Sequence, residues 1–146
     1  MSYKDTASFG KRQEYIVTAE LLKRGFDVYM TLVDDQGIDC IIRLDEKHYL
    51  DIQIKARSET AKQSHLFAGM KIEKVRPNYY FIFYTENDGN LWIIPSEDLK
   101  LLCSVNKTGK HVGKMSLNIP KSNKVQEFDK YKNENGFKLL APTSQE

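Results

Sequence analysis

The stretch "QGIDCIIRLDEKHYLDIQIKAR", residues 36–57, has the clearest pattern in the chain. Two runs rich in isoleucine, 38–44 and 49–56, flank a charged turn at 45–48. Runs that alternate apolar and polar residues on either side of a polar turn are typical of a β-hairpin. We therefore predict that these two runs are paired strands.

The second run places three polar side chains on one face. Side chains two apart in a strand share a face, so Asp51, Gln53 and Lys55 point one way and the aliphatic residues between them point the other. A hairpin loop with an odd number of residues brings Asp39 of the first run to the same polar face. With three loop residues Asp39 lies opposite Lys55, and with five it lies opposite Gln53. A loop with an even number of residues would put Asp39 on the other face. The isoleucines do not exclude this register, because a central strand can be apolar on both faces.

Residues 8–24 predict a helix, with Ser8 as its N-cap and Gly25 placed to end it. At about 100° per residue, Glu14 lies near the middle of a mostly apolar arc. The other members of the arc are Gly10, Tyr15, Val17, Thr18, Leu21 and Leu22, and the opposite side carries Gln13, Glu20, Lys23 and Arg24. A carboxylate that faces a core is costly unless it is paired or bound to a cation, so Glu14 needs a partner.

The rest of the chain predicts further strands and helices around this hairpin. We expect strands at 26–33, 79–85, 91–95 and 115–119, a weakly helical connection at 59–75, and helices at 96–102 and 124–132. Ser96 would cap the first of these two helices, and a frayed tail would follow the second. The order of a helix, three strands, a helix, two strands and a helix predicts an α/β fold, a single domain with a mixed central β-sheet flanked by helices.

A divalent cation would satisfy the carboxylates that these elements bring together. Mg²⁺ prefers oxygen ligands, keeps several waters and pairs with phosphate oxygens, which makes it a common partner for Glu14, Asp39 and the strand of Asp51. The ammonium of Lys55 could then orient an attacking water or offset the charge that develops on a phosphate. The alternative is structural: Glu14, Lys55 and Asp51 would form a buried salt-bridge network.

These motifs resemble those of the PD-(D/E)XK nuclease superfamily, which has the restriction-endonuclease-like fold. The resemblance covers residues 9 to about 95 and rests on the order and spacing of three short motifs. They are "FGKRQE", which ends at Glu14, "GIDC", which contains Asp39, and "DIQIK", which ends at Lys55. A G-I-D strand followed by I-Q-x-K is similar to the branch of the superfamily whose third motif is Q-x-K rather than E-x-K.

The resemblance implies a restriction-endonuclease-like core and a Mg²⁺-dependent nuclease that hydrolyses DNA phosphodiester bonds, with Mn²⁺ as an alternative ion. It implies Asp39 as the chief metal ligand, Gln53 as a second ligand through its amide oxygen, Glu14 as an accessory ligand and Lys55 as the catalytic lysine. The backbone carbonyl of Ile54 is often a ligand as well.

Gln53 departs from the commoner acidic residue, and this weakens the expected metal site. A site built from Asp39, Gln53 and Glu14 would hold Mg²⁺ less strongly than three carboxylates would. Asp51, two residues back on the same face, is a candidate metal ligand that would compensate. An equally simple interpretation makes Asp51 a surface residue paired with Arg43.

Length and composition agree with one soluble domain. The chain has 146 residues, 40% of them hydrophobic and 29% charged, which is enough to bury a core without disulfides. We divide residues 1–146 into a nuclease-like core at about 8–104 and a basic C-terminal extension at about 105–146. Cys40 and Cys103 have apolar neighbours typical of reduced core thiols, and no apolar run suits a signal or a membrane span, so we expect a cytoplasmic protein without membrane contact.

Positive charge gathers toward the C-terminus. The formal net charge is +2, but residues 101–138 carry eight lysines against three carboxylates, a net charge of +5 that leaves −3 for the rest. We expect a polyanion, DNA, to dock there. The lysines that we assign to this contact are Lys107, Lys110, Lys114, Lys121 and Lys124. A solvated lysine-rich surface is the alternative.

Three functions remain open from the sequence. The first is the nuclease, acting on DNA as a monomer or a homodimer. The second is a catalytically inactive nuclease-like domain that binds nucleic acid or a protein partner, with Gln53 as the mark of lost catalysis. The third is a protein-interaction partner such as an immunity protein, for which an acidic surface would be the better sign. Metal-dependent cleavage separates the first from the second.

Overall fold

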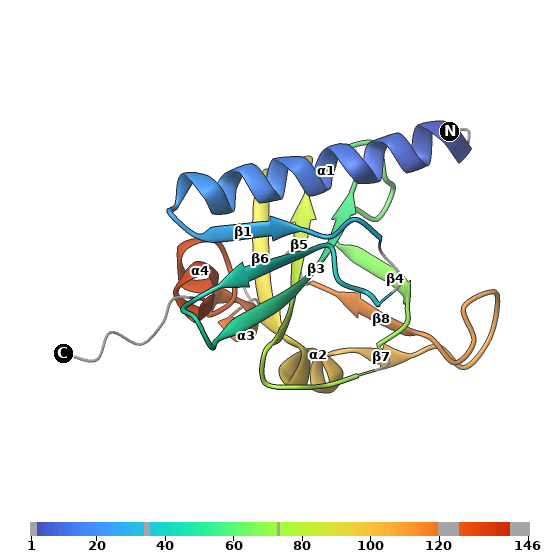
Figure 1. Cartoon of the computed structure of the whole chain (residues 1–146). Coiled ribbons are helices and arrows are strands. Elements are labelled where there is room, and N and C mark those ends of the chain that lie inside the picture. Colours follow the sequence, from blue (N-terminus) through green and yellow to red (C-terminus); the bar gives the residue numbers. More distant parts are fainter. Residues whose placement is uncertain (1–2, 34–35, 73, 120–125, 141–146) are drawn as a thin grey trace.

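The chain forms two β-sheets with helices packed around the larger one (Figure 1). The computed structural model describes residues 3–33, 36–72, 74–119 and 126–140. In chain order the elements are α1 (Tyr3–Lys23), β1 (Asp27–Met30), β2 (Cys40–Arg43), β3 (Tyr49–Arg57), β4 (Leu66–Met70), β5 (Tyr79–Thr85), β6 (Asn90–Pro95), α2 (Ser96–Leu102), β7 (Ser104–Val105), β8 (Met115–Asn118), α3 (Gln126–Asp129) and α4 (Glu134–Leu140). None of these helices combines the length and the apolarity needed to cross a membrane.

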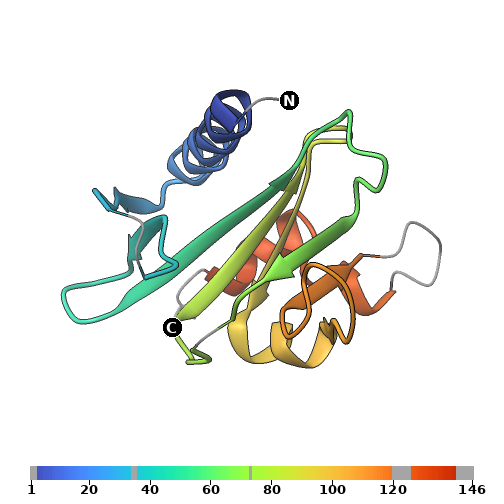
Figure 2. The ribbon, with the colours of Figure 1, turned by 90° about the vertical axis from the view of Figure 1, so that its right-hand side faces the viewer.

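The larger sheet has five strands in the order β1-β2-β3-β5-β6. β3 and β5 run parallel, and every other neighbouring pair in this sheet is antiparallel. The smaller sheet has three antiparallel strands in the order β4-β8-β7. In Figure 2, α1 lies on one side of the larger sheet, while the smaller sheet and α2 lie on the other. The mixed-sheet α/β fold predicted from the sequence is therefore confirmed.

Alternation along the strands divides the apolar side chains into two cores. On the α1 side, Ile52 and Ile54 of β3 pack with Val17 of α1 and Phe137 of α4. The core on the other side draws on β5, β6, α2 and the smaller sheet, and includes Phe67, Phe81, Phe83, Trp92, Leu99 and Leu117. Because the polar residues of β3 alternate with its isoleucines, they project toward this second side.

Helix α1 starts earlier than predicted and ends close to the predicted residue. It begins at Tyr3, so Ser8 lies inside the helix and is not its N-cap. At the other end Gly25 has φ +89°, a conformation that glycine adopts without strain. The N–H of Phe26 donates to the carbonyl oxygen of Leu21 at 3.1 Å. This bond is part of the Schellman motif by which Gly25 closes the helix.

The buried face of α1 is narrower than the predicted arc. Val17 is buried as expected, but Tyr15 and Leu22 are exposed, and Gln13, which we placed on the opposite side, is buried. The buried positions, 13, 17, 18 and 21, follow the spacing of three and four residues that defines one stripe of a helix, and this stripe faces the sheet. Glu14 lies on this stripe and is half-buried.

The prediction for the connection between β3 and β5 is wrong. Among its described residues, 59–72 and 74–75, there is no helix, and the connection instead contains β4, which pairs with β8. Phe67 and Met70 are buried in the second core, while Ala68 between them is exposed. This strand depends on a partner far along the chain, and local propensity does not report such a partner.

Helix α2 begins at Ser96 as predicted, but this serine does not cap it. The hydroxyl of Ser96 donates to the carbonyl oxygen of Arg76 at 3.0 Å and accepts a hydrogen bond from the N–H of Arg76 at 3.2 Å. Pro95 occupies the N-cap position. Ser96 therefore links α2 to the loop before β5.

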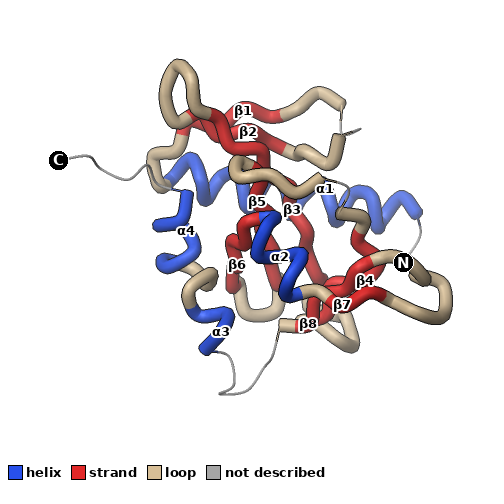
Figure 3. Tube along the Cα trace, turned by 90° about the horizontal axis from the view of Figure 1, so that it is seen from below, coloured by secondary structure: helices blue, strands red, loops and turns tan. Residues whose placement is uncertain are grey.

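The described residues after position 125 belong to the fold and do not form a frayed tail. The helix predicted at 124–132 is shorter, α3, and a further helix, α4, follows it and lies beside β6 (Figure 3). Phe137 and Leu140 of α4 are buried in the first core. Arg24, which directly follows α1, pairs with Glu134 at 2.5 Å, and its guanidinium lies 3.7 Å from the ring centroid of Phe137. Residues from the segment 105–146 thus complete the core.

Candidate functional site

The register of the β2–β3 hairpin determines which polar side chains meet. Cys40 pairs with Ile52, and the last pair of the hairpin leaves a loop of five residues, 44–48. Continued by one position, this register sets Asp39 opposite Gln53. It is the second of the two odd-loop registers that the sequence allows, and it puts Asp39 on the face of Gln53 and Lys55.

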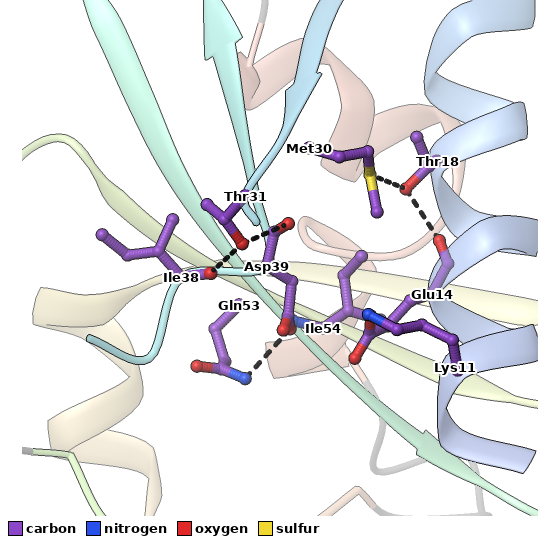
Figure 4. Close-up of polar contacts among 9 residues, drawn as sticks. All are labelled: Lys11, Glu14, Thr18, Met30, Thr31, Ile38, Asp39, Gln53 and Ile54. Atoms are coloured by element: carbon purple, nitrogen blue, oxygen red, sulfur yellow. Dashed lines mark hydrogen bonds and ion pairs between the residues drawn. The ribbon is translucent and has the colours of Figure 1, made fainter. Parts of the chain in front are cut away.

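The carboxylate of Asp39 is buried at the start of β2, with 3% of the residue exposed. Its Oδ2 atom accepts hydrogen bonds from the N–H of Ile54 at 2.7 Å and from Nε2 of Gln53 at 3.0 Å (Figure 4). β2 begins at Cys40, so on the β2 side of β3 no strand among the described residues pairs with Ile54. The Asp39 carboxylate accepts the hydrogen bond from the Ile54 N–H that a strand carbonyl would otherwise accept. Hydrogen bonds to a charged acceptor are strong, so Asp39 is held in one orientation at an open edge of β3.

The backbone of Asp39 is held as firmly as its side chain. Its N–H donates to the carbonyl oxygen of Ile52 at 2.7 Å, and its own carbonyl oxygen accepts from the N–H of Thr31 at 3.2 Å. The hydroxyl of Thr31 lies 3.1 Å from the same carbonyl oxygen and 2.9 Å from that of Ile38, to which it also donates. These contacts tie the residue to β3 on one side and to the chain after β1 on the other.

A glycine is required beside Gln53. Gly37 has φ +68°, and a Cβ at this position would lie 3.0 Å from both Oε1 of Gln53 and the hydroxyl oxygen of Tyr79. That hydroxyl donates to the carbonyl oxygen of Gly37 at 2.6 Å. The loop before Asp39 is therefore packed against the amide of Gln53 and supported by a side chain from β5. Tyr79 cannot be recognised as part of the site from the sequence, where the glycine of "GID" is the one local signal of a close approach.

Glu14 forms an ion pair with Lys11 of the same helix. Nζ of Lys11 lies 3.0 Å from Oε2 of Glu14, whose side chain is 19% exposed. The hydrogen bond to Glu14 and its negative charge raise the pKa of Lys11, and the charge of Asp39 adds to the effect. Figure 4 shows the ammonium of Lys11 and the carboxylate of Glu14 on the side of α1 that faces Asp39 and Ile54. Sequence reasoning missed Lys11, although its spacing of three residues from Glu14 is the ordinary signal for such a pair.

Lys55 and Asp51 do not join Glu14 in a salt-bridge network, so the structural alternative is wrong. Lys55 is half-buried and forms no ion pair or hydrogen bond with any residue that the structure describes. Asp51 pairs with Arg76 at 2.5 Å, whereas the sequence suggested Arg43. Nε of Arg43 instead donates to a backbone carbonyl in the hairpin turn. The ammonium of Lys55 thus shares the polar face of β3 with Gln53 without a charged partner among the described residues.

The carboxylates of Asp39 and Glu14 both affect the pKa of Cys40. Burial raises the pKa of the Cys40 thiol to about 12, and the negative charges of Asp39 and Glu14 add to this shift. Both carboxylates are therefore within electrostatic range of one buried side chain, although they come from opposite faces of the sheet. A thiol with so high a pKa stays protonated at neutral pH and is not a nucleophile.

The site lies at an edge of the larger sheet. Two surface cavities, of about 600 and 510 Å³, are lined by other residues, one between the α1–β1 turn and the β2–β3 turn and the other between α1 and α4. Asp39, Gln53 and Glu14, which we predict to converge around one cavity, line neither of these two. In the described part of the chain no three His, Cys, Asp or Glu residues are grouped closely enough to hold a metal ion.

The lysines expected to contact DNA lie partly in the β7–β8 loop. Lys107, Lys110 and Lys114 are exposed there, and Figure 1 shows this loop extending away from the body of the fold. Lys121 and Lys124 lie outside the described residues. The three exposed lysines are available for contact with a polyanion.

Comparison with known proteins shows a likeness of fold to a solved structure. Neither a protein-family model nor a curated protein matches the sequence. Among solved structures, the bacterial homing endonuclease I-Ssp6803I superposes with a TM-score of 0.62 over 90% of both chains, at 16% sequence identity. The chain has a nuclease-like α/β fold. At this identity the likeness concerns the arrangement of helices and strands, and the chemistry must be argued from the residues of the site.

Proposed function

We propose that this protein is a Mg²⁺-dependent endonuclease that hydrolyses DNA phosphodiester bonds and also accepts Mn²⁺. The observation that carries the proposal is the carboxylate of Asp39, fixed at the open edge of β3 by Ile54 and Gln53, with the ammonium of Lys55 on the same strand face. The nuclease-like fold and the resemblance of the motifs to the Q-x-K branch of the PD-(D/E)XK superfamily support it.

The donor atoms suit a hard cation. Asp39, Glu14 and the amide oxygen of Gln53 are oxygen ligands of the kind that Mg²⁺ takes, with water completing its shell. Gln53 now presents its amide nitrogen to Asp39, so its side chain has to turn to offer the oxygen. The N–H and C=O of a strand residue point to the same side, so the carbonyl of Ile54 faces this edge too. A bound ion would lower the pKa of a water ligand and neutralise charge on the phosphate.

The residues of the chain have separable roles in such a reaction. Asp39 is fixed before any substrate arrives, so no reorganisation of its backbone is needed. Lys55, which has no charged partner among the described residues, can donate a hydrogen bond to the attacking water or to a phosphate oxygen as negative charge develops. Glu14 stands across the edge on α1 and adds the second negative charge.

Asp39→Asn tests the proposal. Wild type is expected to nick supercoiled plasmid with Mg²⁺ or Mn²⁺, and the variant to lose about 100-fold or more of this rate, because the amide keeps an acceptor for Ile54 but removes the charge. Asp27→Asn, an exposed carboxylate on β1, is the matched control and should cut like wild type. A wild type that cuts no supercoiled, linear or single-stranded DNA with either ion would contradict the proposal.

The second candidate is a catalytically inactive nuclease-like domain that binds nucleic acid or a protein partner. It is favoured by one observation: among the described residues no group of three His, Cys, Asp or Glu side chains could hold a metal ion. In that case DNA binding would persist without metal and without cleavage.

Charge reversal tests the DNA-binding role of the β7–β8 loop. The double variant Lys110→Glu plus Lys114→Glu is expected to weaken binding to all DNA sequences. The slope of log K against log salt should also become less negative, by about one for each phosphate that the protein no longer neutralises. Binding is measured by fluorescence anisotropy over a range of salt concentrations. The control is Lys23→Glu plus Lys47→Glu, which changes the net charge equally at exposed positions elsewhere. Equal effects of both pairs would exclude the β7–β8 loop as the docking surface.

A further inference from the structure

Lys11 is the feature of the site that the proposed reaction does not yet use. It lies one turn before Glu14 on α1, and its ammonium is 3.0 Å from the Glu14 carboxylate. Its side chain is 56% exposed, so the pair adds little to the stability of the helix. The charge of Asp39 also acts on Lys11, although Asp39 belongs to the opposite face of the sheet. Lys11 is therefore a cation in contact with the Glu14 carboxylate, on the side of α1 that faces Asp39 (Figure 4).

We propose that Lys11 is a built-in counter-ion of the site: in the metal-free protein its ammonium holds the Glu14 carboxylate, and a divalent cation must displace it to use that carboxylate as a ligand. The inference rests on the proposed function, because it assumes that Glu14 and Asp39 take a divalent ion. Lys11 then sets the concentration of metal at which the site fills. It is a positioning residue that acts through Glu14.

The geometry makes this displacement easy. Lys11 is held by a single ion pair in which more than half of its side chain is exposed, and a lysine side chain has a flexible four-carbon stem that can carry the ammonium into solvent. Lys55 is held more firmly, because its backbone lies within β3 and is paired with β5. The two lysines therefore have different tasks: Lys55 stays at the site, and Lys11 leaves Glu14 when the metal arrives.

The test compares Lys11→Met with Lys11→Arg and with Lys23→Met. Removal of the competing charge is expected to lower the apparent Kd for Mn²⁺, measured by calorimetry in the absence of DNA, by about threefold to tenfold. Lys11→Arg retains a cation and should stay near the wild-type Kd. Lys23 lies on the same helix, 12 residues or about 18 Å further along, and its replacement should change nothing. Thermal midpoints provide a second readout: Mn²⁺ should raise that of Lys11→Met more than that of wild type.

The outcomes separate this inference from the proposed function. If wild type binds Mn²⁺ and cuts DNA while Lys11→Met binds the ion with unchanged or weaker affinity, the counter-ion role is overturned and the nuclease stands. If Lys11→Arg binds as tightly as Lys11→Met, the effect does not come from charge, and the inference is again overturned. If no variant and no wild type binds the ion, the proposed function and the inference fall together.

Discussion

Replacing Lys55 by alanine is expected to lower the rate of Mg²⁺-dependent DNA cleavage by about 100-fold or more while DNA affinity stays nearly unchanged. The reason is that Lys55 has no ion pair or hydrogen bond with a described residue, so none of the described contacts is lost when its ammonium is removed. A group that acts only as charge develops lowers the rate constant when it is removed, and it leaves ground-state binding intact. The free energy of unfolding should change by less than about 1 kcal/mol.

Plasmid nicking and thermal unfolding measured side by side decide this prediction. Lys100→Ala, an exposed lysine on α2, is the matched control and should leave both quantities at wild-type values. A Lys55→Ala protein that melts many degrees early would show that the lysine supports the fold. One that folds and cuts at the normal rate would remove Lys55 from the reaction.

Gln53→Glu is expected to destabilise the metal-free protein and to strengthen its binding of divalent ions. Nε2 of Gln53 donates to Asp39 at 3.0 Å, and both residues are buried, at 7% and 3% exposure. A glutamate there replaces a donor by a second negative charge, and an uncompensated buried charge costs about 3 kcal/mol or more. The same pair of carboxylates is a better ligand set for Mg²⁺, so the apparent Kd should fall by about tenfold or more.

Thermal unfolding with and without Mn²⁺ checks both parts of the prediction. The variant should melt below wild type in a chelator and gain more than wild type when the ion is added. Gln63→Glu, which adds the same charge at an exposed position, should show neither change. A Gln53→Glu protein that is as stable as wild type without metal would mean that Asp39 and Gln53 do not share a charge-sensitive site.

Much of the fold follows from local pattern. The strand at 79–85 has the bounds of β5, and the glycine at 25 closes α1, because both depend on residues within a few positions of each other. The polar face of β3 also follows from the sequence, since the period of two along a strand places Gln53 and Lys55 together whatever surrounds them.

Other features were wrong in the prediction because they depend on distant partners. The segment 59–75 contains a strand rather than a helix, since β4 is paired by β8 more than 40 residues later. Residues 134–140 form a helix with a buried face because α4 packs on β6 and contacts Arg24, which follows α1. In both cases the apolar residues are visible in the sequence, but the surface that buries them is not.

The sequence by itself determined that Asp39 and Gln53 could share a strand face, and that Glu14 on its helix needed a partner. Tertiary structure alone decided that the hairpin loop has five residues, which sets Asp39 beside Gln53 rather than Lys55. It also decided that Lys11 satisfies Glu14, that Arg76 takes Asp51, and that Lys55 is left without a partner among the described residues. The physical reason is that alternation and helical spacing fix directions along one element, whereas the pairing of charges depends on which elements pack together and on the hydrogen bonds that set their register.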